Sequence, residues 1–270
     1  MESGITYDIR FATRMPKSYL RENRPETIRI HALMARQAAT GEVVLYSRPT
    51  GSPRVFTVAV CAKDRPGLFS RIAGAFTLHG MNIVDARAYT THNRIALDLF
   101  TVSLPLAKSL APYDWEAPRR TIADSLAGRL DLGAALDETL ASIPRWRCAP
   151  PGLVPDVQFV RDRSRKYTRI TVRASDEPGL LYRLTHCLTR CHVNILNAEI
   201  RTEGFRARDV FHVRGMDGTL FLSEDRLSVI RRMLLRELAP SLEQDAGRRS
   251  GAGRKEPPEE AVVALSEAGG

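Results

Sequence analysis

The sequence predicts an α+β protein built from two copies of one small domain, and three observations carry this prediction. A stretch containing Asp-x-Pro-Gly-Leu occurs twice. In both copies an alternating, β-branched pattern precedes this unit and an amphipathic helical pattern follows it. Two further alternating stretches and a closing helical pattern then complete each copy.

The repeat is visible without gaps. Residues 63–90 read KDRPGLFSRIAGAFTLHGMNIVDARAYT, and residues 175–202 read SDEPGLLYRLTHCLTRCHVNILNAEIRT. Asp176 follows Asp64 by 112 positions, and DLFTV at 98–102 matches DVFHV at 209–213 after a slip of one residue. Self-similarity of this kind indicates a duplicated domain.

Each element of the repeat has its own pattern. The expected strands are residues 54–62, 81–90 and 94–103 in the first copy, and 168–174, 193–202 and 207–215 in the second. The helix stripes are Leu68, Ile72 and Phe76, matched by Leu180, Leu184 and Leu188, and the closing helices carry Ile122, Leu126 and Leu130, matched by Leu227, Ile230 and Leu234. Gly80 and His192 occupy the helix ends. This order, with a last strand, predicts two tandem ferredoxin-like (βαββαβ) domains.

Flanking segments add to the two domains. An additional strand is expected before each copy, at 42–48 and at 156–162, and a helix is expected to open after Pro25. From about Glu243 the chain is rich in Gly, Arg and Glu, which is typical of disorder. The predicted organisation is a connecting helical segment at 1–41, domains at 42–147 and 148–241, and a disordered tail at 242–270.

Composition limits the classes of function. Hydrophobic residues make up 43% of the chain, which is enough for packed cores. No apolar run approaches the roughly 18 residues of a membrane span, and no signal peptide is expected, so a cytoplasmic protein without a membrane partner is predicted. The net charge of +9 fits an anionic partner, but the basic residues are scattered, which disfavours nucleic acid.

The cysteines are expected to be free thiols. HCLTRCH, residues 186–192, invites a zinc interpretation, but no second ligand pair lies at zinc-site spacing. Cys187 also corresponds to Ala75 in the first copy, which favours a small core position. We therefore expect no metal site and no cofactor in this chain.

The Asp-x-Pro-Gly unit offers backbone chemistry. Pro66 suits the first turn of a helix, and Gly67 lets a ligand approach closely. The free N–H groups of that turn and the helix dipole favour a carboxylate. Asp64 is placed to cap the turn or to accept a hydrogen bond from a ligand ammonium group, with Asn82 nearby. The alternative is a plain capped helix terminus; the duplication favours a site for a free amino acid.

The candidate ligand-binding residues follow from this interpretation, and none of them is assigned a catalytic or metal-binding role. They are Asp64, Arg65, Pro66, Gly67, Leu68, Asn82 and Ile83 in the first copy, and Asp176, Glu177, Pro178, Gly179, Leu180, Asn194 and Ile195 in the second.

DRPGLFSRIAGAFTLHGMNIVDA and DEPGLLYRLTHCLTRCHVNILNA resemble ACT domains, which bind small effectors, often amino acids, at domain interfaces. RFATRMPKSYL, then PETIRIHALM and the tandem pair, resemble the C-terminal end of the bifunctional uridylyltransferase/uridylyl-removing enzymes that modify protein PII. The resemblance covers about residues 8–240. It implies glutamine sensing in nitrogen regulation, with PII or separate catalytic domains as partners.

The resemblance also marks what the chain lacks. The family's nucleotidyltransferase site needs Gly-Ser followed closely by paired acids that hold magnesium, whereas Gly51-Ser52 is far from Asp114-Trp115-Glu116. Its hydrolase site needs a His-Asp pair, and no His here is followed by Asp. Whether the chain is an enzyme therefore stays open. The alternatives are an active uridylyltransferase, a stand-alone ACT regulator and an RNA-binding ferredoxin-like protein.

Overall fold

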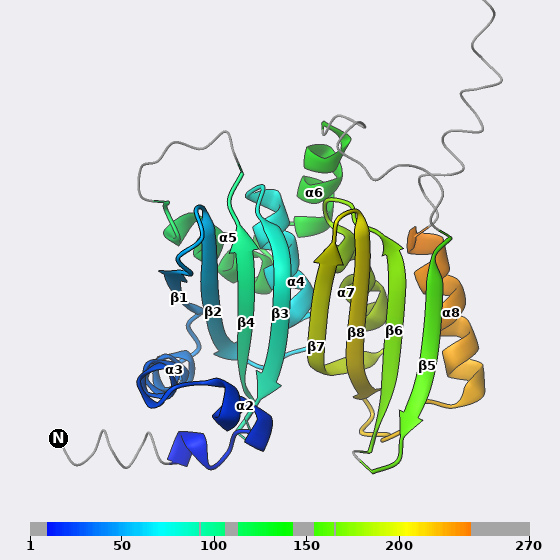
Figure 1. Cartoon of the computed structure of the whole chain (residues 1–270), viewed down its shortest axis with the longest axis horizontal. Coiled ribbons are helices and arrows are strands. Elements are labelled where there is room, and N and C mark those ends of the chain that lie inside the picture. The colour runs from blue at the N-terminus through cyan, green and yellow to red at the C-terminus, as the bar shows by residue number, and fades with distance from the viewer. Residues whose placement is uncertain (1–9, 92, 106–112, 143–153, 165, 239–270) are drawn as a thin grey trace, which may run out of the picture. The chain divides into compact units, whose positions relative to one another are not determined.

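Two four-stranded antiparallel sheets, one from each repeat, dominate the computed structural model (Figure 1). The structure describes residues 10–91, 93–105, 113–142, 154–164 and 166–238, all of which fall in one compact unit. Strand order is β1-β2-β4-β3 in the first sheet and β5-β6-β8-β7 in the second. The predicted α+β, ferredoxin-like fold of both copies is confirmed.

The elements recur in the same order in the two repeats. The first contains β1 (Val44–Pro49), β2 (Val55–Lys63), α4 (Leu68–Leu78), β3 (Asn82–Thr90), β4 (Ile95–Ser103), α5 (Glu116–Leu126) and α6 (Leu132–Ala141). The second contains β5 (Asp156–Asp162), β6 (Tyr167–Ser175), α7 (Leu180–Arg190), β7 (Val193–Glu203), β8 (Arg206–Gly215) and α8 (Glu224–Leu238).

The outer edge of each sheet is formed by the strand that precedes the repeat. β1 pairs antiparallel with β2, and β5 pairs antiparallel with β6. Within the described residues no strand follows the closing helix of either copy. The additional strands expected from the sequence therefore occupy the edge that a last strand has in the βαββαβ order.

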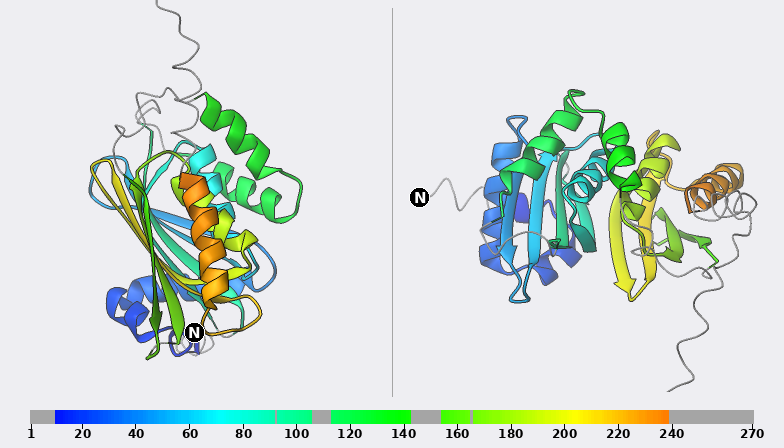
Figure 2. Two further views of the ribbon diagram at one scale, coloured as in Figure 1. Left: turned by 90° about the vertical axis from the view of Figure 1, so that its right-hand side faces the viewer. Right: turned by 90° about the horizontal axis from the view of Figure 1, so that it is seen from above.

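The first sheet is buried on both faces. Val58 and Val60 of β2 point to the face covered by α4 and α5, whereas Ala59 and Cys61 point to the opposite face. That opposite face is covered by α2 (Lys17–Glu22) and α3 (Pro25–Ala38), and Figure 2 shows these helices beside the first sheet. Helix α3 begins at Pro25, as the sequence predicts.

The two repeats meet through their inner edge strands. β3 and β7 lie side by side and run in opposite directions, and α4 packs against α7 on one face (Figure 1). Buried side chains of both repeats form one continuous hydrophobic cluster. The junction between the repeats is therefore part of the core.

The closing helix of the first repeat differs from the prediction. Helix α5 ends at Leu126, and the chain turns at Gly128, whose φ is 73°. Asp131 then caps a separate helix, α6, by accepting a hydrogen bond from Ala134 N at 3.1 Å. Leu130 lies in the connection, so the single helix predicted through Leu130 is wrong. A left-handed residue such as Gly128 ends a helix.

The structure also tests the predicted helix ends and the predicted burial of Cys187. Gly80 and His192 both adopt positive φ at the helix ends, at 72° and 54°. Cys187 is fully buried, as expected for a small core position. The predicted tail at 242–270 lies outside the described residues, and the predicted domain limits remain predictions. None of the described helices is both long and apolar enough to span a membrane.

Candidate ligand-binding site between the repeats

The Asp-x-Pro-Gly loops of the two repeats share one backbone conformation. Asp64 N donates to Arg94 O at 2.8 Å, and Asp176 N donates to Phe205 O at 2.9 Å. Gly67 and Gly179 then precede the helices with φ of 77° and 79°. This left-handed conformation is readily available to glycine and costs other residues about 1–2 kcal/mol, which explains the glycine at both places.

Two details of the predicted loop are wrong. Helix α4 begins at Leu68, so Pro66 lies in the turn before the helix and not in its first turn. In the described structure neither α4 nor α7 receives a side-chain cap, so Asp64 and Asp176 do not cap these helices. The turn is closed instead by the backbone, since Leu68 N donates to Arg65 O at 3.1 Å. The aspartate carboxyl groups are therefore available for another role.

A small cavity of about 30 Å³ lies where the first loop meets the second repeat. Its lining from the first repeat includes Asp64, Arg65, Gly67, Leu68 and Asp98, and its lining from the second includes Thr189, Asn194 and Ile195. By this measure a cavity needs about 10–15 Å³ to hold a water molecule, so there is room for at least one. The cavity is therefore a narrow, polar space between two domains.

The structure brings the predicted site residues together across the repeats. Asp64 shares the cavity with Asn194 of the other copy, whereas Asn82, Ile83 and Pro66 do not line it. The sequence placed a ligand ammonium group near Asp64 or Asn82, and the structure adds Asn194 of the other copy to the surroundings of Asp64. The antiparallel arrangement of β3 and β7 is the reason, because it places the start of β7 beside the first loop. The ligand-binding role of these residues stays a prediction.

The second loop has different surroundings. A Cβ atom on Gly179 would lie 3.0 Å from Leu140 Cδ1 and 3.6 Å from Thr77 Cγ2. Glu177 forms a salt bridge with Arg183, with 2.9 Å between Glu177 Oε2 and Arg183 Nη2, and both side chains are largely buried. The remaining residues predicted for this loop, Asp176, Pro178 and Leu180, stand at the corresponding backbone positions and do not line the cavity.

Two buried aspartates were missed by the sequence reasoning. Asp98 lies on the face of β4 that is covered by α4. It is 3% exposed and lines the cavity. Asp209 of β8 is its counterpart and is 2% exposed. The sequence signal for these residues was an aspartate inside an apolar strand at the same place in both copies. Such a residue indicates a function or a partner, because carboxylates are rarely buried without one.

The raised pKa values of these aspartates follow mainly from burial. Burial, and secondarily the charge of Asp64, raise the pKa of Asp98 well above its usual value. Burial, with a smaller contribution from Asp176, raises the pKa of Asp209 to about 8. Asp64 also has a raised pKa because it is partly buried, although Arg94 opposes the shift. Each loop therefore overlies a pair of carboxyl groups that lack full hydration.

No metal centre is indicated in the part of the chain that is described. Within it no three His, Cys, Asp or Glu side chains are grouped closely enough to hold an ion. His186 stacks on Tyr182 with ring centroids 5.4 Å apart, and Cys187 points into the core. Residues 186–190 of the HCLTRCH segment belong to amphipathic helix α7, Cys191 is its C-cap, and His192 follows with a positive φ of 54°.

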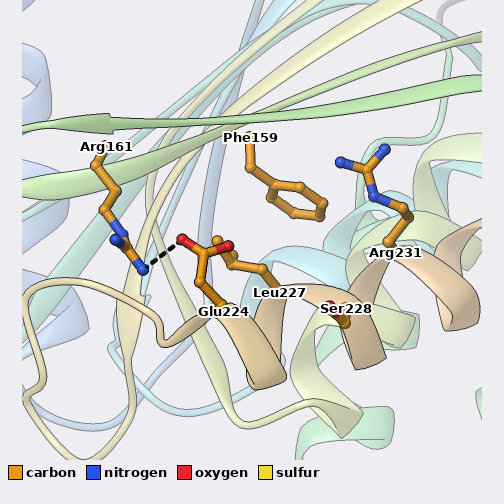
Figure 3. Close-up of a pocket in the computed structure, with 6 residues that line it drawn as sticks. All are labelled: Phe159, Arg161, Glu224, Leu227, Ser228 and Arg231. Carbon is orange, nitrogen blue, oxygen red and sulfur yellow. Dashed lines mark ion pairs between the residues drawn. The ribbon is translucent and has the colours of Figure 1, made fainter.

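A larger hollow of about 340 Å³ lies between β5 and α8 (Figure 3). Both of its arginines are engaged: Arg161 pairs with Glu224 at 2.9 Å, and Arg231 lies 5.0 Å above the Phe159 ring. Arg231 also donates to Val157 O at 2.5 Å. These contacts fasten α8 to the edge strand, so we assign the hollow a structural role.

Comparison with known proteins agrees with this architecture. The ACT domain family model matches residues 56–110. Bifunctional uridylyltransferase/uridylyl-removing enzymes are similar to the chain over most of its length: that of Novosphingobium aromaticivorans is 37% identical over 78% of this chain and 23% of its own. The enzyme of Rhodopseudomonas palustris is 36% identical over 68% of this chain and 20% of its own. That of Bradyrhizobium diazoefficiens is 33% identical over 86% of this chain and 25% of its own.

The chain thus spans about a fifth to a quarter of the length of these curated relatives. Among solved structures, an aspartate kinase from Synechocystis is similar with a TM-score of 0.33 and 16% identity, over 71% of this chain and 27% of its own. That likeness is too weak to add to the comparison. Residues 56–110 thus match the ACT domain family, and most of the chain is similar in sequence to a stretch of the bifunctional uridylyltransferase/uridylyl-removing enzymes.

Proposed function

We propose that this chain is an amino-acid-sensing regulatory module, with glutamine as its effector, that acts in nitrogen signalling together with PII-modifying catalytic domains. The observation that supports this best is the cavity between the repeats, where Asp64 and Asp98 of one copy meet Asn194 of the other. Glutamine and PII come from the resemblance to the uridylyltransferase/uridylyl-removing enzymes.

The cavity has partners for both ends of a free amino acid. An ammonium group placed near Asp64 and Asp98 would receive charge-assisted hydrogen bonds and would favour ionisation of these carboxyl groups. The first-turn N–H groups of α4 lack helix carbonyl partners and lie at the positive end of the helix dipole. Together with Arg65 they suit the carboxylate, and Asn194 supplies a polar wall.

The position of the cavity couples ligand binding to the packing of the two repeats. The cavity is lined by both repeats, so a ligand held there would contact the first loop and the start of β7 at the same time. A ligand shifts an equilibrium by its differential affinity for the two states. Binding at this place would therefore alter the packing of the two repeats, which is the kind of output a regulatory module needs.

Titration calorimetry with L-glutamine on the purified chain tests the proposal. We expect saturable heat with wild type and a loss of affinity of about tenfold or more in Asp64→Asn, because a hydrogen bond to a charged group contributes about 1.5–3 kcal/mol. D-glutamine and L-alanine serve as matched ligands. Absence of heat up to millimolar L-glutamine, in a sample shown to be folded, would exclude the proposed effector.

The alternatives receive less support from the structure. Phe100 and Phe211, the strand aromatics available for base stacking, are buried against the helices, which disfavours RNA binding on the sheet. Uridylyl transfer by the chain alone is tested with PII, UTP and magnesium, and turnover in that assay would establish the enzyme alternative.

A further inference from the structure

We infer that the chain binds one effector, at the Asp64 loop, because helix α6 fills the equivalent place at the Asp176 loop. This inference rests on the proposed function and specifies which half of the duplicated site is open. The two loops are matched in backbone conformation, so the difference between them lies in what covers them.

The walls opposite the two loops are equivalent. A Cβ atom on Gly67 would lie 3.2 Å from Thr189 Cγ2, and one on Gly179 would lie 3.6 Å from Thr77 Cγ2. Thr77 and Thr189 are the same position of the repeat, 112 residues apart. The local twofold relationship alone therefore predicts two sites.

The side chains that lie over Gly67 and Gly179 are not equivalent. At Gly179 the nearest side chain is Leu140 of α6, with Cδ1 at 3.0 Å and Cδ2 at 3.5 Å from the Cβ position. At Gly67 the three nearest atoms belong to Arg71, Thr189 and Ser70, and the nearest is Arg71 Nη1, at the end of a long flexible side chain. A ligand can displace the Arg71 guanidinium, but it can reach Gly179 only by moving a helix.

Helix α6 is held firmly where it lies. The Cβ position of Gly74 in α4 is 2.8 Å from Leu132 Cδ2 and 3.1 Å from Leu136 Cδ1, so the absence of a side chain at Gly74 lets α6 approach. Leu132 and Leu136 are both buried. Figure 1 shows α6 above α4 and α7, and Tyr182 of α7 also contacts the Gly74 position at 2.8 Å.

The sequence does not repeat α6. Leu132, Leu136 and Leu140 form its apolar stripe. Leu126 and Leu130 match Ile230 and Leu234 at an offset of 104 residues, and the same offset places Arg236, Pro240 and Gln244 at the positions of the stripe. Among the described residues, a helix that follows the closing helix is therefore found in the first copy alone.

Charge also separates the two loops. The first carries Arg65 at its second position, which suits a ligand carboxylate, and the second carries Glu177 in a salt bridge with Arg183. Beneath the covered loop, Asp209 Oδ1 is buried and finds no hydrogen-bond partner among the described residues. Its counterpart, Asp98, instead lines the open cavity. Each loop therefore has a buried carboxyl group beneath it, but only the one beneath the first loop lines the cavity.

Calorimetric titration of the full chain with L-glutamine, using matched variants, tests the inference. We expect a stoichiometry of about one per chain, a loss of affinity of about tenfold or more in Asn194→Ala and in Asp64→Asn, and wild-type affinity in Asn82→Ala and Asp176→Asn. Asn82 and Asn194 are both exposed, so these two substitutions keep the comparison valid if an aspartate variant fails to fold.

The possible failures are distinguishable. A stoichiometry of two, or equal losses in Asn82→Ala and Asn194→Ala, would overturn the inference and leave the proposed function standing. No heat from folded wild type would remove both.

Discussion

Tyr19 and His31 form a buried hydrogen bond, with 2.7 Å between Tyr19 Oη and His31 Nδ1. The pair lies in the cluster that fastens α2 and α3 to the outer face of the first sheet. Tyr19 also packs edge-on against Tyr89 of β3, the strand that meets the second repeat. This polar pair therefore links the N-terminal helices to the strand at the repeat junction.

Replacing Tyr19 by Phe is expected to destabilise the protein by about 1–3 kcal/mol, because His31 Nδ1 would lose its partner in a buried place. Urea unfolding of the two proteins measures the difference. Tyr46→Phe is the control, since Tyr46 is 39% exposed and its substitution should change stability by less than about 0.5 kcal/mol. Equal effects of the two substitutions would contradict the assignment.

The same pair predicts a dependence of stability on acid pH. Burial, with the charge of Arg48, lowers the pKa of His31 to about 4, whereas His in an unfolded chain titrates near 6.5. The unfolded state therefore takes up the proton first, and stability falls as pH drops from about 6.5 to about 4. The difference in melting temperature between wild type and His31→Gln should change over this range and be constant above it.

Asp209 predicts the opposite slope. Its pKa is raised to about 8 mainly by burial, with Asp176 contributing, whereas an unfolded aspartate titrates near 3.9. The folded state binds the proton more tightly, so this residue lowers stability progressively as pH rises from about 4 to about 8. Asp209→Asn should gain stability relative to wild type across that interval, as followed by thermal melts. A constant difference would show that Asp209 is ionised in the folded protein at all these pH values.

Gly67 and Gly51 form a matched test of the first loop. Both have positive φ, 77° and 92°, but a Cβ at Gly67 would meet Arg71 and Thr189, and one at Gly51 has nothing within 4 Å. Substitution by Ala should cost about 1–2 kcal/mol at each from backbone strain. We expect an additional loss at Gly67, together with weaker glutamine binding, and unchanged binding in Gly51→Ala. Unfolding curves and calorimetry report the two effects.

Gly74→Ala tests how closely helix α6 packs against α4. Inside a helix, Ala is favoured over Gly by about 1 kcal/mol, yet the new Cβ would lie 2.8 Å from both Leu132 Cδ2 and Tyr182 Cδ2. Overpacking of a core costs about 1–3 kcal/mol, so we expect net destabilisation. Gly133→Ala is the control, because its nearest neighbours are at 3.4 Å and 3.5 Å. A Gly74→Ala protein as stable as Gly133→Ala would show that α6 is loosely held.

Much of the fold follows from local sequence rules. The alternation of Val58, Val60 and Ala62 predicts β2, and the Leu180, Leu184 and Leu188 stripe predicts α7, because backbone periodicity alone determines which residues share a face. The 112-residue offset then transfers the assignments of β2, α4 and β3 to the other copy.

The set of residues that lines the cavity could not be predicted from local sequence rules. An offset shows that Asn82 and Asn194 are equivalent, but not that Asp64 meets the second of them, since this depends on how β3 and β7 are juxtaposed. Asp98 is hidden in an apolar strand whose inward face emerges only with the tertiary structure. Helix α6 was missed because Gly128 breaks an apparently continuous pattern.

Joining both repeats in one polypeptide has a consequence for how the module responds to dilution. A junction of this kind between separate chains would lose half of its cavity lining on dissociation. Here β3 and β7 are tethered, so their encounter is intramolecular and has an effective concentration fixed by the connection. For the proposed glutamine site, the midpoint of a titration should therefore be the same at nanomolar and micromolar protein, so that the response depends on the ligand concentration and not on the concentration of the chain.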